Sequence, residues 1–561
     1  DRRQIAGSDD AHLPGLRRLA GDAHRHGAVI AAQLVHGGTN SLLDIAEGRP
    51  LLVPSKKPPP APDELSGMVT PDEVGQMMAP FATPTAAYRV RAATDDDLQW
   101  VVDRFVDAAR RVVAAGFDAV ELHAGHGYLL HAFLSPHSNQ RTDRWGGSVE
   151  ARAELFTTVV RAVRAAVGPE VALWARVGAH EAHRDPGQRI EDALVAMGLG
   201  RDAGLDALHV TAYAEPMVAT GITDGHTPHQ PGALLGSAAR VRRELGVPVI
   251  AMGRVSPEAA EQALADGSAD VIAMGRALIA DPDLPSKLAR GERHRVRPCA
   301  YQYRCIGAIF LNQPVTCSVN PDAGHEAEPV PPADRPRRVV VVGGGPAGLE
   351  CARRLADRGH RVELWEAGEE LGGMLRVAEL VDPDLAGLRD WLVGAATDAG
   401  VTVHLAREAT EAVDAEVVVW AAGADWAPAD GPSLAEVASW VEGTGPVPAE
   451  VAVTGSSKAA VSTALALRSR GADVTLVADD PVLAPELGLP GRFRLVAAAR
   501  AAGVEEAGTV PDRAVPVAVG RRPTPPPSFG PDVEVHVIGD AGGAAGLAAA
   551  LRQAAAVAAA V

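Results

Sequence analysis

Residues 94–130 read TDDDLQWVVDRFVDAARRVVAAGFDAVELHAGHGYLL, a helical pattern followed at once by a strand pattern. Thr94 and the three aspartates after it resemble a capping box at a helix start. Apolar side chains then recur at helical spacing as far as Gly116, where the helix is expected to end. A strand is predicted over 118–123, so this stretch has the helix-then-strand order of a parallel α/β sheet.

The same alternation continues on both sides of this stretch. Strands are predicted over 29–35, 118–123, 171–177, 206–211, 248–252 and 269–274. Six units are two fewer than a closed (β/α)8 TIM barrel requires, so we expect such a barrel with its two N-terminal units missing from the sequence. An open doubly wound sheet is the alternative. The Pro-rich excursion over 44–97 is expected to form a βα loop on the active-site face.

A new pattern begins after a Pro-rich linker over 321–336. The run Gly343-Gly-Gly345-Pro-Ala-Gly348 follows an apolar strand and opens a helix, and the next strand ends at Glu366. Glycines at these positions permit the tight turn, the approach of a pyrophosphate to the helix N-terminus and close helix packing, while the acid binds ribose hydroxyls. A late turn at Gly539-Asp540 suits the same ligand. We therefore predict a Rossmann-like domain that binds FAD or ADP.

A second, degraded fingerprint lies within 451–477. Its glycine positions read Gly455, Ser457 and Ala460, and side chains there would crowd a pyrophosphate. NAD(P)H binding and a nucleotide fold that has lost its ligand both stay open for this unit.

Three of the four cysteines lie between the two halves, at Cys299, Cys305 and Cys317. This spacing is typical of iron–sulfur ligation, whereas zinc sites usually have paired CxxC knuckles. The position expected for a further cysteine is occupied by Gln302, a poor ligand for such a cluster. An intact four-iron cluster, a cluster with fewer irons or a non-thiolate ligand, and an empty remnant remain alternatives.

The strongest chemical signal is the end of the 118–123 strand, because barrels build their active sites on that face. His123 and His126 can present two imidazole donors to one carbonyl oxygen, and Tyr128 can supply a proton. These three residues are predicted to be catalytic.

These residues, with Phe133-Leu-Ser-Pro136, Asn139-Gln-Arg-Thr-Asp143 and Trp145-Gly-Gly147, resemble the old yellow enzyme family. With the dinucleotide half attached, the chain resembles the NADH:flavin oxidoreductase branch that contains 2,4-dienoyl-CoA reductase and trimethylamine dehydrogenase. The resemblance implies FMN bound in the barrel, with a set of contact residues made up of Gln33, Arg176, Gly253, Arg254, Gly275 and Arg276. Gln33 would contact the pyrimidine edge, Arg176 would lie near N1, and the others would hold the phosphate.

The resemblance implies a division into four regions. These are an FMN-binding barrel (1–290), the cysteine segment and linker (291–336), an FAD/ADP-binding domain (337–445 with 525–561) and a degenerate NAD(P)-binding-like domain (446–524).

Two reactions are compatible with this family. In the preferred one, reduced FMN transfers a hydride to an activated C=C, with electrons relayed from the dinucleotide half. In the other, an amine is oxidised and electrons pass to a protein acceptor, as the stretch Thr223-Asp-Gly-His226-Thr-Pro228 suggests by its resemblance to amine dehydrogenases. An inactive flavoprotein scaffold is the third interpretation. The expected partners are a small-molecule substrate and NAD(P)H or a protein electron carrier, and homo-oligomerisation is left open.

Composition excludes other classes of function. The net charge of −18 argues against nucleic acid or an anionic membrane as partner. No stretch approaches the roughly 18 apolar residues of a membrane span. Four cysteines in 561 residues do not make a disulfide framework, and a cytoplasmic location is expected.

Overall fold

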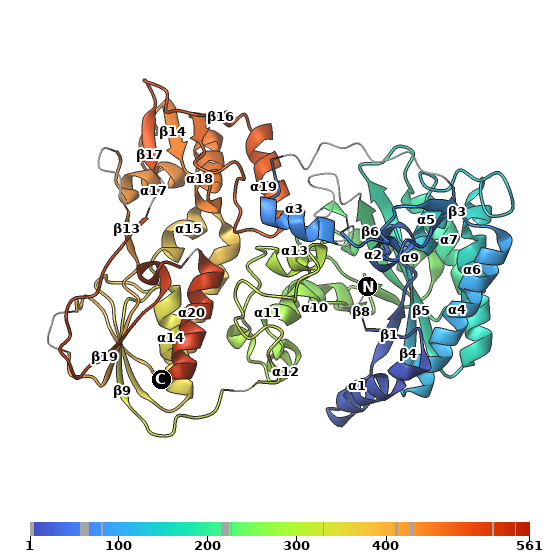
Figure 1. The fold of residues 1–561 in the computed structure, drawn as a ribbon, viewed down its shortest axis with the longest axis horizontal. Coiled ribbons are helices and arrows are strands. Elements are labelled where there is room, and N and C mark those ends of the chain that lie inside the picture. Colours follow the sequence, from blue (N-terminus) through green and yellow to red (C-terminus); the bar gives the residue numbers. More distant parts are fainter. Residues whose placement is uncertain are drawn as a thin grey trace. The chain divides into compact units, whose positions relative to one another are not determined.

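The computed structural model describes residues 5–55, 67–79, 82–214, 224–225, 227–328, 330–409, 413–426, 431–518, 521–544 and 546–561. The chain divides into two compact units (Figure 1). The first comprises Asp1–Leu65 and Val74–Met274, and the second comprises Ser66–Glu73 and Gly275–Val561. In the described residues, no helix is long and apolar enough to cross a membrane.

The first unit is built on a parallel sheet whose strand order follows the chain. Its strands, in spatial order, are β1 (Ala31–Leu34), β4 (Ala119–Ala124), β5 (Ala172–Ala182), β6 (Ala207–Ala214), β7 (Val249–Ala251) and β8 (Val271–Ile272). All six predicted strands are confirmed. A sheet that winds in one direction is the arrangement of a TIM barrel, whereas a doubly wound sheet reverses its order at a switch point. The open doubly wound alternative is therefore wrong.

Helices cover this sheet. They are α1 (Leu13–Arg25), α4 (Asp95–Ala114), α5 (Leu129–Leu134), α6 (Val149–Val167), α7 (Ile190–Asp202), α9 (Leu235–Leu245) and α10 (Pro257–Ala265). The predicted capping box is present, since the Thr94 side chain accepts from Asp97 N and the Asp97 side chain accepts from Thr94 N. Figure 1 shows α4 and α6 side by side along the sheet, and apolar side chains from these helices and the strands form one core.

The Pro-rich excursion lies between β1 and α4, on the βα side of the unit as predicted. It is preceded by the 3-10 turn η2 (Gly38–Asn40) and begins within α2 (Leu42–Ala46), and its further elements are β2 (Leu51–Val53), α3 (Pro71–Met78) and β3 (Val90–Ala92). β2 and β3 form a separate parallel pair. Residues 56–66 and 80–81 of the excursion lie outside the described residues, as do residues 223 and 226 of the stretch over 223–228 that resembles amine dehydrogenases.

The second unit contains two parallel sheets of the Rossmann type. The first has the order β11 (Thr402–His404), β10 (Arg361–Trp365), β9 (Arg338–Val342), β12 (Val417–Trp420) and β19 (Glu534–Val537). The second has the order β16 (Glu505–Ala507), β15 (Asp473–Val477), β14 (Glu450–Thr454) and β17 (Val515–Ala518). An antiparallel pair, β13 (Ala424–Trp426) with β18 (Arg521–Pro523), links them in sequence. The chain thus leaves the first sheet, builds the second and returns to the first through β19.

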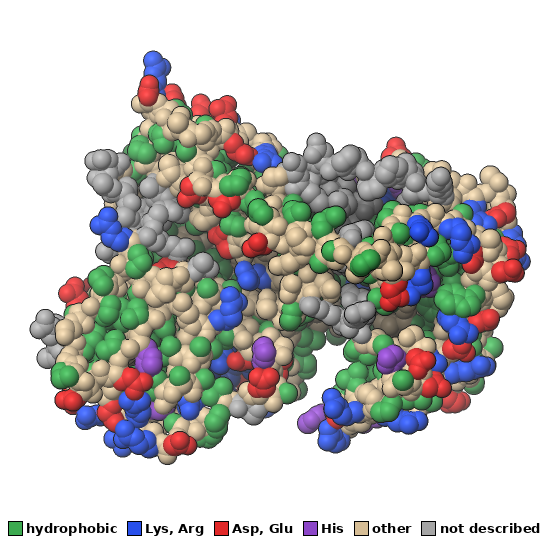
Figure 2. Space-filling model, viewed as in Figure 1, with side chains coloured by type: hydrophobic (Ala, Val, Ile, Leu, Met, Phe, Trp, Pro, Cys, Tyr) green, Lys and Arg blue, Asp and Glu red, His purple; other side chains and the backbone are tan. Residues whose placement is uncertain are grey.

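The second unit also contains ten helices within its described residues. They are α11 (Arg276–Ala280), α12 (Leu284–Ala289), α13 (Arg304–Phe310), α14 (Pro346–Asp357), α15 (Leu375–Val381), α16 (Ala386–Asp398), α17 (Leu434–Glu442), α18 (Lys458–Ser469), α19 (Leu489–Ala501) and α20 (Leu547–Ala560). The Ala-rich C-terminal helix α20 lies beside α14 (Figure 1), and both contribute to the core of the first sheet. Figure 2 shows basic and acidic side chains intermingled over the visible face, with no broad basic area in its described residues.

Candidate active site

The predicted catalytic residues lie together at the carboxyl end of β4. His123 is the fifth residue of this strand and is only 3% exposed. Its ring centroid lies 4.8 Å from that of His126 and 4.9 Å from that of Tyr128. The structure therefore brings two imidazoles and one phenol into a single cluster.

A tight turn presents His126 and Tyr128. The backbone of His126 has φ 59° and that of Gly127 has φ 75°, so two successive residues are left-handed. A Cβ atom on Gly127 would lie 2.6 Å from the hydroxyl oxygen of Tyr213, so only glycine fits. Thr211 Oγ1 lies 2.9 Å from Nε2 of His126, and Nδ1 of His131 accepts the Gly127 N–H at 3.1 Å. Side chains of β6 and α5 thus hold the turn from two sides.

The electrostatics of the cluster keep His123 and Tyr128 neutral. Burial, and next the positive charge of Arg176, lower the pKa of His123 to about 3, so the imidazole is uncharged at neutral pH. Burial raises the pKa of Tyr128, against the opposing effect of Arg176, so the phenol keeps its proton. Nδ1 of His123 is buried and has no hydrogen-bond partner among the described residues. A neutral donor and a protonated phenol are what polarisation of a carbonyl and proton donation require.

Arg176 lies directly beside the cluster, since it is paired with His123 in the register of β4 and β5. Its Nη2 lies 2.8 Å from the Met252 sulfur, while its Nε is buried without a partner in the described part of the chain. An unsatisfied buried guanidinium N–H is costly, and the electron-rich pyrimidine edge of a flavin would satisfy it. The donor set next to His123 therefore fits FMN.

β4 also carries a buried carboxylate that the sequence analysis missed, that of Glu121, two residues before His123. Glu121 accepts hydrogen bonds from Gln33 Nε2, from Trp174 Nε1 at 2.8 Å and from His209 Nδ1 at 2.7 Å. Burial alone would raise its pKa, but these hydrogen bonds, that of His209 first, bring it down to about 2. Since the amide nitrogen of Gln33 is bound to Glu121, a contact of Gln33 with a flavin would use its carbonyl oxygen. The sequence could have indicated Glu121, because side chains two residues apart in a strand lie on the same face, and Glu121 therefore shares the face of His123.

The predicted phosphate residues follow β7 and β8. Gly253 has φ 112°, and Arg254, with φ 54°, donates from Nη1 to the His229 carbonyl at 2.5 Å. Gly275 and Arg276 open α11 and belong to the second unit, where Arg276 lies 5.0 Å from the ring of Tyr301. A shared phosphate site of these four residues remains a prediction.

In the second unit, the glycines of the first fingerprint have separate tasks. A Cβ on Gly343 would meet the Ala421 carbonyl oxygen at 2.3 Å, and one on Gly348 would meet the Gly343 carbonyl oxygen at 1.9 Å. A Cβ on Gly345 would meet nothing within 4 Å, and no side chain caps α14 at this residue. Gly343 and Gly348 are therefore needed for packing, while Gly345 leaves an open helix N-terminus that fits the pyrophosphate of FAD or ADP.

Glu366 and the late turn surround this glycine loop. The carboxylate of Glu366 accepts from Gly344 N at 2.7 Å and from Gly368 N at 2.8 Å. Gly539 N donates to Gln553 at 2.9 Å, and a Cβ on Gly539 would lie 3.0 Å from that of Ala347 on α14. Asp540 follows in the 3-10 turn Gly539–Gly542. The late turn thus packs against the start of α14, as a shared site requires, and the ribose role of Glu366 remains a prediction.

The three cysteines of the cysteine segment, which belongs to the second unit, are free thiols. Burial raises the pKa of Cys299 to about 12 and also raises that of Cys305, and the neighbouring thiols add to both shifts. Gln302 is turned to other partners, donating to the Ala300 carbonyl at 2.8 Å and to Asp382 at 3.1 Å. Over the described ranges, no three histidine, cysteine or acidic side chains are grouped closely enough to hold a single metal ion. The donors present do not complete a four-thiolate set and therefore do not fit a four-iron cluster bound by four cysteines.

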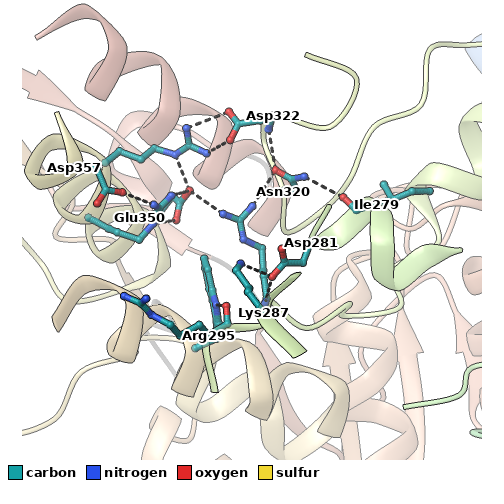
Figure 3. Close-up of polar contacts among 12 residues, drawn as sticks. Ile279, Asp281, Lys287, Arg295, Asn320, Asp322, Glu350 and Asp357 are labelled. Atoms are coloured by element: carbon teal, nitrogen blue, oxygen red, sulfur yellow. Dashed lines mark hydrogen bonds and ion pairs between the residues drawn. The ribbon is translucent and has the colours of Figure 1, made fainter. Parts of the chain in front are cut away.

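The ends of the cysteine segment are fixed by a buried charge network (Figure 3). Arg297 donates to Asn320 at 2.9 Å, which joins the residues just before Cys299 and just after Cys317. Asp322 pairs with Arg354 of α14, and Glu350 of the same helix pairs with Arg354 at 2.6 Å. The segment is therefore tied to the helix whose N-terminus forms the open nucleotide site.

A sequence model of the NADH:flavin oxidoreductase / NADH oxidase family matches residues 3–295, more than half of the chain. The chain belongs to this family. A model of the NAD(P)-binding Rossmann-like domain matches residues 341–387. The predicted FMN barrel followed by Rossmann-like domains is therefore confirmed as the fold, and FMN is the cofactor that the family places in the barrel.

Two curated relatives extend the match beyond the barrel. A metal reductase of Desulforamulus reducens is 37% identical over 72% of this chain and 57% of its own length. An NADH oxidase of Thermoanaerobacter brockii is 33% identical over 75% of this chain and 62% of its own length. The matched region thus spans about three fifths of these relatives. The solved structure of a 2-naphthoyl-CoA reductase in complex with 2-naphthoyl-CoA superposes over 97% of this chain and 87% of its own, with a TM-score of 0.83 and 24% identity, and shows the same fold.

Proposed function

We propose that this protein is an FMN-dependent reductase of activated C=C bonds, such as those of enones and enoyl compounds, with NAD(P)H as the source of electrons. The cluster of His123, His126 and Tyr128 is the observation that carries this proposal, because it combines two imidazoles, that of His123 being neutral, with a protonated phenol at the end of β4. The name of the NADH oxidase relative supports NADH as donor.

The side chains of the cluster would divide the work. FMN, when bound, supplies the hydride for the carbon distal to the substrate carbonyl. His123 and His126 donate hydrogen bonds to the carbonyl oxygen, where negative charge develops during the transfer. Tyr128 donates its phenolic proton to the carbon next to the carbonyl. Arg176 would hold a positive charge near the pyrimidine edge of bound FMN, and Gln33, oriented by Glu121, would bind that edge through its carbonyl oxygen.

The remaining assignments are part of the same proposal. Residues 1–290 form the FMN barrel, and 337–445 with 525–561 hold FAD or ADP at the open N-terminus of α14. Because the four cysteines of the protein are free thiols, we also propose a reducing, cytoplasmic location.

Anaerobic mixing tests the reaction. We expect NAD(P)H to bleach the oxidised flavin, and secondary or tertiary amines to leave it unchanged. Bleaching by an amine but not by NAD(P)H would instead establish the amine-oxidising alternative. A chain that purifies colourless and takes up no added FMN would indicate the non-catalytic scaffold.

A further inference from the structure

The second nucleotide fold differs from the first at the N-terminus of its helix. In a Rossmann unit the pyrophosphate binds the free N–H groups at this point. In the first fold the N-terminus of α14 is uncapped and open. In the second fold the corresponding groups of α18 already have partners within the chain.

Two side chains occupy the start of α18. Ser457 caps its own helix, since its Oγ accepts from Ala460 N at 3.2 Å. The carboxylate of Glu486 accepts from Lys458 N, the first N–H of the helix, at 2.6 Å. A carboxylate therefore takes the position and the charge that a pyrophosphate oxygen would have there.

The loop that carries Glu486 also covers the turn before α18. Ala484 N donates to the Ser456 carbonyl at 2.6 Å, and Asp480 N donates to Ser456 Oγ at 2.7 Å. Ala484 is fully buried and has φ 52°, a left-handed conformation that costs an alanine about 1–2 kcal/mol. Val482 and Leu487 are 3% and 5% exposed. The loop is thus packed down on the turn and is not a solvent-exposed flap.

Two anchors hold this loop in place. Arg492, which is 1% exposed, donates to the Pro485 carbonyl at 2.9 Å, to the Leu487 carbonyl at 3.1 Å and to Glu73 at 2.6 Å. On the other side the cysteine segment holds the loop, through Gly488 N to the Gln302 carbonyl at 3.0 Å and Arg304 to the Glu486 carbonyl at 3.1 Å.

Gly488 allows the loop to lie directly against the cysteine segment, because a Cβ there would lie 2.0 Å from the Tyr303 carbonyl oxygen. Lys458, a cation at the start of the helix that could neutralise a phosphate, is paired with Asp382. A dinucleotide would have to displace Glu486, break the packing of 482–488 and separate this ion pair.

We infer that residues 480–488 are an internal ligand that closes the second nucleotide fold to NAD(P)H, with the carboxylate of Glu486 in place of the pyrophosphate. The domain acts as a brace for the cysteine segment and not as a coenzyme site. NAD(P)H must then transfer its hydride directly to the barrel flavin, which is reduced as NAD(P)H becomes NAD(P)⁺. This inference goes beyond the proposed reaction, because it names the flavin to which NAD(P)H transfers its hydride.

Hydrogen–deuterium exchange on the FAD- and FMN-loaded full-length protein tests this inference independently of turnover. Peptides covering 455–460 and 482–488 should be protected in the wild-type protein, and NADH or ADP-ribose should leave their exchange unchanged. Glu486→Ala should accelerate exchange in both peptides by about tenfold or more. Glu486→Gln keeps an acceptor oxygen and should change exchange less, and Glu505→Ala, an exposed glutamate on β16, should change nothing.

Several results would overturn the inference. Protection of 455–460 by NADH or ADP-ribose in the wild-type protein would show that the fold accepts the coenzyme. Unchanged exchange in Glu486→Ala would show that the carboxylate does not hold the loop. If Glu486→Ala fails to fold, the wild-type titration with ADP-ribose decides alone, since ligand-induced protection at 455–460 contradicts closure and its absence supports it.

Discussion

Replacing Glu121 by glutamine should destabilise the barrel by an amount that follows from its pKa. The folded protein holds this pKa at about 2, below the ordinary value of 4.5, and this difference is worth about 3 kcal/mol at neutral pH. His209, whose own pKa is lowered by burial, is a neutral partner, so we expect the lower part of a range of about 2–3 kcal/mol. A glutamine amide would also place an N–H where Gln33, Trp174 and His209 all present donors.

Urea unfolding, followed by tryptophan fluorescence, measures this loss. Because the folded pKa is depressed, the stabilisation is complete above pH 4.5 and is lost as the pH falls towards 2. The gap between the wild-type protein and Glu121→Gln should therefore be largest at neutral pH and shrink below pH 4.5. Glu170→Gln, at an exposed glutamate of the same unit, is the control. Equal stability of Glu121→Gln and wild type at neutral pH, or a gap that persists undiminished at low pH, would refute the reasoning.

Three further predictions concern the catalytic cluster. Tyr128→Phe should slow flavin reoxidation by an enone by about 10²-fold or more while leaving reduction by NADH unchanged, as measured by stopped-flow absorbance, and equal slowing of both half-reactions would contradict a proton-donor role. Because the pKa of His123 is lowered to about 3, the rate of enone reduction should show no acidic limb between about pH 5 and 8, and a limb near pH 6.5 would contradict a neutral His123. Gly127→Ala should abolish most enone reduction, because its Cβ would meet Tyr213 at 2.6 Å. Gly168→Ala is the control, since Gly168 has φ 81° with nothing within 4 Å of the added Cβ, and it should cost only about 1–2 kcal/mol of stability. Equal activity of the two variants would show that the turn does not position the cluster.

The sequence was sufficient for features that depend on local pattern. The capping box at Thr94 and Asp97, the six strands and the cluster at the end of β4 were all predicted, because helix caps, strand periods and the carboxyl-end rule act over short distances.

Features that depend on register and on long-range packing were not predictable. Glu121 meets Gln33 and His209 only because β1, β4, β5 and β6 align in one register across the sheet. Glu486 and Lys458 lie 28 positions apart in the chain, and they meet through a loop whose path is set by Arg492. Serine in the fingerprint signalled a degraded site, but no local pattern indicates which carboxylate would fill it.

The central claim is that the cluster on β4 serves carbon–carbon double-bond reduction, and one measurement tests it most directly. The FMN-loaded protein is photoreduced without NAD(P)H under anaerobic conditions and mixed with 2-cyclohexen-1-one. We predict reoxidation of the flavin with one equivalent of the saturated ketone formed, and loss of this reaction in His123→Ala. A reduced flavin that persists in the presence of the enone, in a protein whose oxidised flavin is bleached by an amine, would contradict the claim.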